Sequence, residues 1–440
     1  MSHDREAVTA ADEECAVVRR ERAHTVQAYG SREERPIVIV DAKGVEVTTA
    51  DGRRLLDFSA QTASCAIGYR HPVMLDRLHR QLDVAVTSPA HIHAGRVDLA
   101  ERLSAETGGE LSRCWFGVTG SDAIEAALMF ARLRPGRWKV VSHLNGYHGS
   151  TLGALSAHGI GRMRHGYEPL LPGFVHVHPP DVLHHHFPAD CDVTDAALAQ
   201  LRHVLLEEDP HQVAAVLVEP IFAGGGVIVP PDSYLRGLRE LCDEFGILLV
   251  YDEVVTGIGR TGKMFAFMHS GAAPDMLVLG KGLTSGYQAL SAVLLREAAD
   301  PYDAADPPHP LHLHTLAGNP MGCAAALATL DVIADERLVE NASARGRELL
   351  AALESRLRES SRLVEIRGRG LLVGIELDPH GADAKALEQR AVHACRDRGL
   401  IVYGSSGPYA VLVLHPPLSV TSAHVASAVD AIHDAIDTLD

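Results

Sequence analysis

Three apolar segments in the middle of the chain are each followed by residues that could take part in catalysis. The segments and the residues after them are 214–218 (AAVLV) with Glu219, 247–251 (ILLVY) with Asp252 and Glu253, and 276–279 (MLVL) with Gly280 and Lys281. Short unbroken apolar runs are typical of strands buried on both faces of an α/β sheet. Because ligands of such sheets bind beyond the carboxyl ends of the strands, we expect these polar residues to face one site.

Lys281 is the candidate for covalent chemistry. The chain contains five lysines, and Lys281 alone follows a buried apolar segment. A desolvated lysine amine can form a Schiff base with a carbonyl compound. Taken singly, each of these residues has an ordinary explanation, since a charged residue at the end of a strand is usually solvated. Their combination on neighbouring strands indicates a site.

Two other segments could complete such a site. Gly120 and Ser121 directly precede a helix that begins near Asp122, where free backbone N–H groups favour a phosphate. A plain helix cap would also explain them. Tyr147 lies in a loop and offers an aromatic face. An amine, a carboxylate for a pyridine nitrogen, an aromatic face and phosphate donors are the parts that pyridoxal phosphate requires.

The elements that would position these residues are those of an α/β protein. Apolar residues recur at helical spacing over 124–131 and 235–245, between the apolar strands. We expect a large, mostly parallel-sheet domain over residues 75–325 and a smaller α+β domain formed by residues 1–74 and 326–440. In the smaller domain, strands are expected at 37–40, 45–47, 54–58, 363–366, 371–377, 400–402 and 411–414.

Six motifs resemble those of the class III pyridoxal-phosphate aminotransferases, and they follow one another in the order found in that family. They are FGVTGSDAIEAALMFAR (116–132), NGYHG (145–149), VEPIFAGGGVIVPP (218–231), DEVVTGIGRTGKMFA (252–266), PDMLVLGKGLTSGY (274–287) and HTLAGNPMGCAAALATL (314–330). The resemblance covers residues 37 to 435. It implies fold type I of the pyridoxal-phosphate enzymes, transfer of an amino group, and a homodimer with shared active sites.

The resemblance also implies roles for individual residues at the cofactor. Lys281 would bind it covalently and move the substrate proton, and Asp252 would pair with its pyridine nitrogen. The remaining expected contacts are Val254 and Tyr147 on the two ring faces, Gly120 and Ser121 at the phosphate, Thr315 at the phosphate of the partner subunit, and Glu219 in support of this network.

Four positions depart from the family pattern and bear on the substrate. Members that hold an α-carboxylate often carry an arginine where this chain has Val413, and its resting partner, a glutamate, where this chain has Gly224. A frequent glycine is replaced by Gln61, and a frequent glutamine by Val255. We therefore expect a terminal amine, such as a diamine or an amino sugar, as the amino substrate. Arg162 or Arg164 would hold the keto acid.

Several other interpretations remain open. The same cofactor would serve an epimerase or an aminomutase, and a catalytically idle homologue is a further alternative. Residues 257–262 satisfy the G-x-G-x-x-G fingerprint of NAD-linked oxidoreductases, but no strong helix follows and no acidic residue lies about 20 positions on. The histidine-rich stretch 176–187 favours a Pro-rich surface loop over a metal site. Arg367 and Arg369 indicate a tight turn.

Composition restricts the partners. Of the 440 residues, 46% are hydrophobic and 22% charged, and the formal net charge is −17. This acidity disfavours binding to nucleic acid, and no apolar run approaches the length of a membrane-spanning helix. Seven scattered cysteines without a CxxC pair and a charged start without an apolar core predict a cytoplasmic protein. No metal site is expected.

Overall fold

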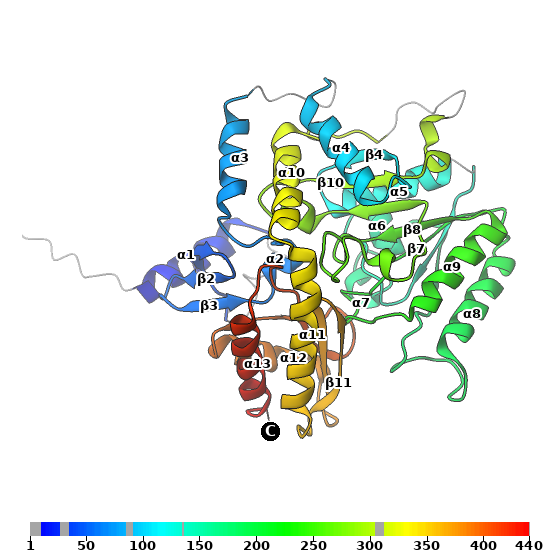
Figure 1. The fold of residues 1–440 in the computed structure, drawn as a ribbon. Coiled ribbons are helices and arrows are strands. Elements are labelled where there is room, and N and C mark those ends of the chain that lie inside the picture. Colours follow the sequence, from blue (N-terminus) through cyan, green and yellow to red (C-terminus); the bar gives the residue numbers. More distant parts are fainter. Residues whose placement is uncertain (1–9, 27–34, 85–90, 134–135, 304–311, 440) are drawn as a thin grey trace, which may run out of the picture.

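The computed structural model describes residues 10–26, 35–84, 91–133, 136–303 and 312–439, and the elements below are those of these residues (Figure 1). A seven-stranded sheet forms the centre of the molecule. Its strands, in spatial order, are β4 (Arg113–Gly117), β10 (Ser291–Leu295), β9 (Met276–Leu279), β8 (Leu248–Asp252), β7 (Val213–Val218), β5 (Lys139–His143) and β6 (Phe174–Val177). The strands β9, β8, β7, β5 and β6 are parallel, whereas β10 is antiparallel to both of its neighbours.

Helices cover both faces of this sheet, which explains its unbroken apolar strands. One face packs against α5 (Gly120–Leu133), where the predicted helical face of Ile124, Ala127, Leu128 and Ala131 is buried. The other face packs against the buried residues of α9 (Asp232–Phe245), among them Leu235 and Leu238. The remaining helices of this region are α3 (Pro72–Leu82), α4 (Ala94–Glu106), α6 (Leu152–Ala157), α7 (Gly161–Arg164), α8 (Val193–Glu207) and α10 (Pro320–Asp335).

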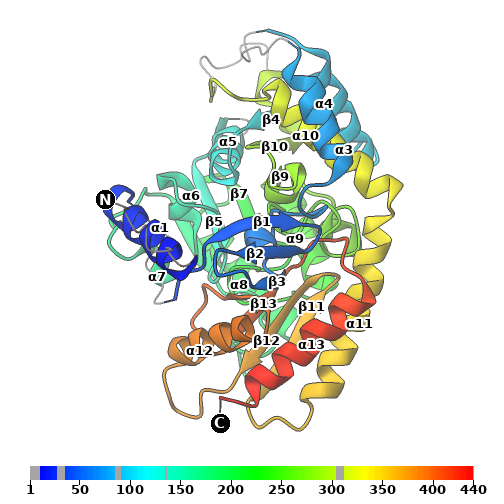
Figure 2. The ribbon, with the colours of Figure 1, turned by 90° about the vertical axis from the view of Figure 1, so that its left-hand side faces the viewer.

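Two four-stranded sheets lie beside the central one. The first has the order β1 (Ile39–Lys43), β2 (Glu46–Thr49), β3 (Arg54–Asp57) and β13 (Leu400–Ile401), and the parallel pairing of β13 with β3 joins the two ends of the chain. The second has the order β11 (Leu363–Arg369), β12 (Leu372–Leu377), β15 (Ala410–Leu414) and β14 (Tyr403–Gly404). In this region α11 (Leu338–Leu357) and α13 (Ser422–Ile436) pack side by side, close to α12 (Ala384–Asp397) (Figure 2). The helix α1 (Ala10–His24) begins the described chain.

The mixed α/β architecture agrees with the sequence-based prediction, and two local predictions need comment. The tight turn near Arg367 and Arg369 is present, because β11 and β12 form an antiparallel hairpin. The Pro-rich surface loop is wrong for His176, which lies in β6. His178, His184, His185 and His186 follow that strand and line a cavity of about 180 Å³ with Tyr409. The domain boundaries at residues 75 and 325 stay a prediction.

In the described part of the chain, no helix has the length and apolar character needed to cross a bilayer.

Residues 60–63 form a single left-handed turn, α2 (Ala60–Ala63), in which all four φ angles lie between 42° and 66°. This backbone conformation is unfavourable for residues with a Cβ atom, and it includes Gln61.

Candidate active site

The polar ends of three strands lie next to one another, as the sequence predicts. The strands β7, β8 and β9 are neighbours in the sheet and run parallel. Val218 pairs with Tyr251, and Asp252 pairs with Val278. The register therefore places Glu219 level with Asp252, and Lys281 lies two residues beyond the end of β9. The two carboxylates and the amine share one edge of the sheet.

Asp252 is held by a residue that the sequence did not single out as functional. Nδ1 of His148 lies 2.9 Å from Oδ2 of Asp252, and the two side chains are 0% and 5% exposed. The backbone N–H of Val254 donates to Oδ1 of Asp252 at 3.1 Å. Each carboxylate oxygen thus has a fixed contact, which orients the group. Nε2 of His148 has no hydrogen-bond partner among the described residues.

Glu219 connects the end of β7 to two loops. Its Oε1 accepts the backbone N–H of Tyr147 at 2.7 Å, and its Oε2 accepts that of Ala223 at 3.1 Å. Burial, followed by the negative charge of Asp252, raises the pKa of Glu219, while the two N–H donors and the charge of Lys281 act in the opposite direction. Glu219 therefore positions the loop that carries Tyr147 and His148, and its role at the cofactor stays a prediction.

Lys281 has an unusual backbone and a shifted amine. It begins η2 (Lys281–Thr284) with a φ of 39°, a conformation that costs of order 1–3 kcal/mol for a residue with a Cβ atom. Burial lowers the pKa of the Lys281 amine, and the negative charges of Asp252 and Glu219 reverse only part of this effect. A lysine in this state offers a larger fraction of the nucleophilic free amine than an exposed lysine does.

A narrow cradle lies between the first turn of α5 and the ends of β8 and β9. A Cβ atom built on Gly120 would lie 3.1 Å from Cγ1 of Val254, and one built on Gly280 would lie 3.3 Å from the same atom. Ser121 faces the glycine of the NGYHG loop: the N–H of Ser150 donates to Oγ of Ser121 at 3.1 Å, and a Cβ atom on Gly149 would collide with that oxygen. Only small residues fit around the start of α5.

These residues fit pyridoxal phosphate on their chemistry. The start of a 14-residue helix supplies free N–H groups for a phosphate. Lys281 supplies an amine, and Asp252 a buried carboxylate whose orientation is fixed. Val254 supplies an apolar surface beside the cradle, and Tyr147 an aromatic ring, which packs edge-on against His158 with 4.6 Å between the ring centres.

Glu253 belongs to the other face of the sheet, because successive residues of a strand alternate. Its carboxylate accepts the N–H groups of Ala266 and Phe267 at 2.6 and 2.9 Å, so it is a structural residue. Thr315 is exposed and lies in the segment before α10. Because the side chains of β8 alternate between the two faces of the sheet, the sequence alone could have predicted that Glu253 and Asp252 point to opposite faces.

The glycines of residues 257–262 form a close-packed loop. A Cβ atom on Gly262 would lie 2.9 Å from the backbone of Ser343 in α11, and one on Gly257 would lie 2.9 Å from the carbonyl of Glu253. Within this loop Arg260 is 2% exposed and donates to the carbonyl of Leu371. No α-helix follows directly, which disagrees with a dinucleotide-binding fingerprint.

Comparisons with known proteins agree with this geometry. The family Aminotransferase class-III matches residues 29–436. The chain is 36% identical to the uncharacterized aminotransferase YhxA of Bacillus subtilis over 93% of its length and 94% of that protein. It is 37% identical to the adenosylmethionine-8-amino-7-oxononanoate aminotransferase of Nitratidesulfovibrio vulgaris, over 91% of its length and 77% of that protein.

A solved structure with a similar fold is that of an amine transaminase from an uncultivated Pseudomonas species in its PLP-bound form. It superposes with a TM-score of 0.88 at 33% identity, over 95% of this chain and 99% of that one. The fold of this chain is therefore fold type I of the pyridoxal-phosphate enzymes, as the resemblance implied. The family match covers nearly all of the described chain. The protein belongs to the class III aminotransferases and is a pyridoxal-phosphate-dependent aminotransferase.

Proposed function

We propose that this enzyme transfers the amino group of a terminal primary amine, one without a carboxylate on the reacting carbon, to a keto acid. The observation that carries the proposal is the apolar environment of Val413. This residue is 5% exposed and lies in a cluster with Ile221, Ala223, Val227, Leu372 and Val411. Recognition of a carboxylate in a dry pocket normally needs a bidentate arginine, and an apolar cluster occupies the position where one would be expected.

The environment of Gly224 supports the same proposal. A Cβ atom at this position would lie 2.9 Å from Cβ of Tyr147, so the backbone of 223–226 has no room for a glutamate side chain there. Both the glutamate and the arginine that pair in other members of the family are therefore absent here, so neither charge is buried without its partner. An apolar pocket wall of this kind favours an amine substrate whose remaining atoms carry no charge. The similarity to an amine transaminase points in the same direction.

Arg162 is the residue we propose for the keto acid. Its guanidinium donates to the carbonyls of Ser406 at 2.7 Å and Ser405 at 3.0 Å. The N–H of Ser406 in turn donates to the carbonyl of Gly224, beside Tyr147. Arg162 can exchange these neutral carbonyls for a carboxylate. Arg164 is the weaker candidate, since it lies 3.9 Å from Glu168.

Arg367 is less suited to this task because its charge is already neutralised. Its guanidinium donates to Glu365 at 2.7 Å, to Glu376 at 2.6 Å and to the carbonyl of Gly226.

The residues of the site divide the work of the reaction. Bound pyridoxal phosphate supplies an electrophilic carbon and an electron-accepting ring. Lys281 would hold that carbon through its amine and would move a proton between its own nitrogen and the substrate carbon. Asp252, oriented by His148, would hold a proton on the ring nitrogen. Gly120 and Ser121 would bind the phosphate, and Val254 and Tyr147 would exclude water from the ring.

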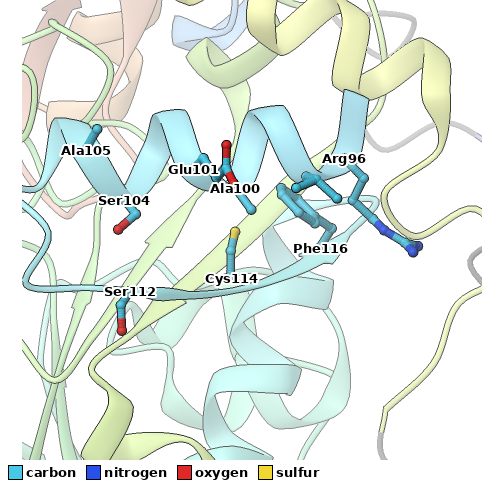
Figure 3. Close-up of a pocket in the computed structure, with 9 residues that line it drawn as sticks. Arg96, Ala100, Glu101, Ser104, Ala105, Ser112, Cys114 and Phe116 are labelled. Atoms are coloured by element: carbon cyan, nitrogen blue, oxygen red, sulfur yellow. The ribbon is translucent and has the colours of Figure 1, made fainter. Parts of the chain in front are cut away.

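We also propose a homodimer with composite active sites. Thr315 is exposed and flanked by Leu313 and Leu316, which are 72% and 58% exposed. Next to this segment a groove of about 510 Å³ runs between α4 and β4, and Figure 3 shows Ala100 and Ser104 facing Cys114 across it. The N-terminal end of α4 touches the segment, because the side chain of Arg96 lies against Gly318. A second copy of the chain would cover these apolar residues and receive Thr315 at its phosphate.

A panel of half-reactions tests the substrate class. The cofactor spectrum should change faster with putrescine, the terminal amine of ornithine and an aminomethyl sugar than with alanine or glutamate. Faster reaction at the α-amine of glutamate or alanine would contradict the proposal. Release of the amine's carbonyl product, an aldehyde for a terminal amine, followed by amination of an added keto acid separates transfer from epimerase or aminomutase chemistry. Arg162→Ala should raise KM for the keto acid and leave the amine half-reaction unchanged.

A further inference from the structure

Three side chains that could bind a metal ion lie together at the first turn of α5. Oδ1 of Asp122, Nε2 of His312 and Nε2 of His314 lie within 4.8 Å of one another. Nε2 of His312 lies 2.9 Å from Oδ1 of Asp122 and 2.9 Å from Nε2 of His314, and His314 also contacts Oδ1. Asp122 belongs to the first turn of α5, whereas the histidines precede α10. The chain brings these three atoms together from segments 190 positions apart.

Protons alone satisfy this arrangement poorly. A neutral imidazole carries one N–H group and one nitrogen lone pair. If both Nε2 atoms carry hydrogens, two N–H groups crowd against one another at a single carboxylate oxygen. If His314 donates to His312 instead, the lone pair of His312 faces the negative oxygen of Asp122. A cation placed between the three atoms accepts a lone pair from each and removes both repulsions.

Neighbouring groups hold the ligands in this orientation. Oδ2 of Asp122 accepts the backbone N–H of Val118 at 2.8 Å, which leaves Oδ1 directed at the histidines. The indole of Trp115 stacks on His312 with 5.7 Å between ring centres and an interplanar angle of 30°. Its Nε1–H donates to the carbonyl of His312 at 3.2 Å. Contacts that orient ligands in this way are typical of metal sites in proteins.

We propose that Asp122, His312 and His314 bind one divalent transition-metal ion. Two imidazole nitrogens and one carboxylate oxygen suit Zn²⁺, Co²⁺ or Ni²⁺, whereas Mg²⁺ and Ca²⁺ prefer oxygen ligands. Zn–N bonds of about 2.0–2.1 Å separate tetrahedral ligand atoms by about 3.3 Å. The two 2.9 Å separations at His312 therefore need to widen by a few tenths of an ångström, and the shorter separation between His314 and Asp122 by more. The fourth position remains for water.

The ion would join two parts of the cofactor site. Asp122 is adjacent to Ser121, and His314 is adjacent to Thr315. A bound ion therefore fixes the segment that carries Thr315 against the first turn of α5. This consequence rests on the roles proposed above for Ser121 and Thr315, whereas the metal site itself does not.

Cobalt titration of the full-length holoenzyme, purified without a histidine tag, tests the site. Tetrahedral Co²⁺ absorbs at longer wavelengths than the cofactor, and we expect these bands to saturate at one ion per chain and to disappear when Zn²⁺ is added. His312→Gln and His314→Gln should each weaken Co²⁺ binding by about a hundredfold, since loss of a mere orienting contact already costs about 10- to 100-fold. His185→Gln, in the histidine-lined cavity beside Tyr409, is the matched control and should bind as the wild type does.

Thermal unfolding provides a second measurement that does not depend on enzymatic activity. Co²⁺ should raise the unfolding midpoint of the wild type and of His185→Gln, because an ion that binds only the folded state stabilises it. It should leave the midpoints of His312→Gln and His314→Gln unchanged. Equal Co²⁺ affinity in wild type and both variants, or loss of binding in His185→Gln, would overturn the proposal. If either His312→Gln or His314→Gln does not fold, the other decides the outcome.

Discussion

His148 and Asp252 form a buried pair in which an imidazole ring holds a carboxylate in place, with 2.9 Å between Nδ1 and Oδ2. The second oxygen of Asp252 accepts the N–H of Val254, so rotation of the carboxylate would break at least one of the two contacts. Both side chains are almost fully buried, which makes any unpaired polar atom costly. The orientation of Asp252 therefore depends on His148.

His148→Phe should slow the amine half-reaction by about ten- to a hundredfold, because a phenyl ring fills the space without contacting Oδ2. His148→Asn, which can donate from a similar position to Nδ1, should recover part of the rate. Stopped-flow absorbance of the cofactor measures both rates, and circular dichroism verifies the fold. A wild-type rate in His148→Phe would show that the pair does not position Asp252.

Asp252→Asn should fold and bind the cofactor but react roughly a hundred- to a thousandfold more slowly, the usual loss when one electrostatic contact to the reacting group is removed. Asparagine has nearly the same shape, but it carries no charge to keep the ring nitrogen protonated. Single-turnover measurements with a saturating amine isolate this step. Asp252→Asn at near wild-type rates would contradict the assigned role.

Lys281 should be the only lysine labelled when the holoenzyme is reduced with borohydride and digested for peptide mapping. Since burial lowers the pKa of its amine, the loading of apoenzyme with cofactor should rise with pH through a midpoint below that of an exposed lysine. Lys281→Ala should fold and lose turnover, while Lys263→Ala, the matched control, should keep both label and activity. Label on Lys263 in the wild type would contradict the assignment.

Much of this site could be predicted because its parts lie at the ends of short apolar strands. The segments before Glu219, Asp252 and Lys281 contain no polar residue, so their burial and their common edge follow from composition alone. The separation of Glu253 from Asp252 follows from the two-residue period of a strand, and could have been predicted.

Other contacts could not be predicted because they join distant segments. His148 and Asp252 are 104 positions apart, and His312 and Asp122 are 190 apart. No local pattern marks such a pair, since their distance depends on how loops after different strands pack. The left-handed turn at Ala60–Ala63 is similar: it contains no glycine, and its φ angles reflect the surrounding structure rather than local preference.

Thr315→Val should weaken pyridoxal phosphate binding by about ten- to a hundredfold. Its hydroxyl would donate to a charged phosphate, a contact worth roughly 1.5–3 kcal/mol. Cofactor titration of the apoenzyme gives the affinity, and sedimentation velocity at the assay concentration gives the assembly state. The neighbouring exposed Leu316→Ala is a control for the segment, because it should alter assembly more than cofactor affinity. A fully active monomer would contradict the composite site.

Val413→Arg should destabilise the resting enzyme rather than convert its specificity. The side chain would enter the apolar cluster with Ala223 and Val411, and Gly224 supplies no carboxylate to neutralise it. An uncompensated charge in such a place costs roughly 3–5 kcal/mol, which should lower the midpoint of thermal unfolding. Val413→Leu, which keeps the apolar character, should stay close to the wild type.

A dicarboxylate ligand provides the decisive comparison for this variant. If the new arginine reaches the site, glutarate should restore part of the lost stability in Val413→Arg and have little effect on Val413→Leu, because only the arginine gains a partner. Differential scanning calorimetry with and without glutarate measures both effects. Equal midpoints for the two variants in the absence of ligand would mean that position 413 already tolerates a cation. The absence of an arginine at that position would then no longer support a terminal amine as the substrate.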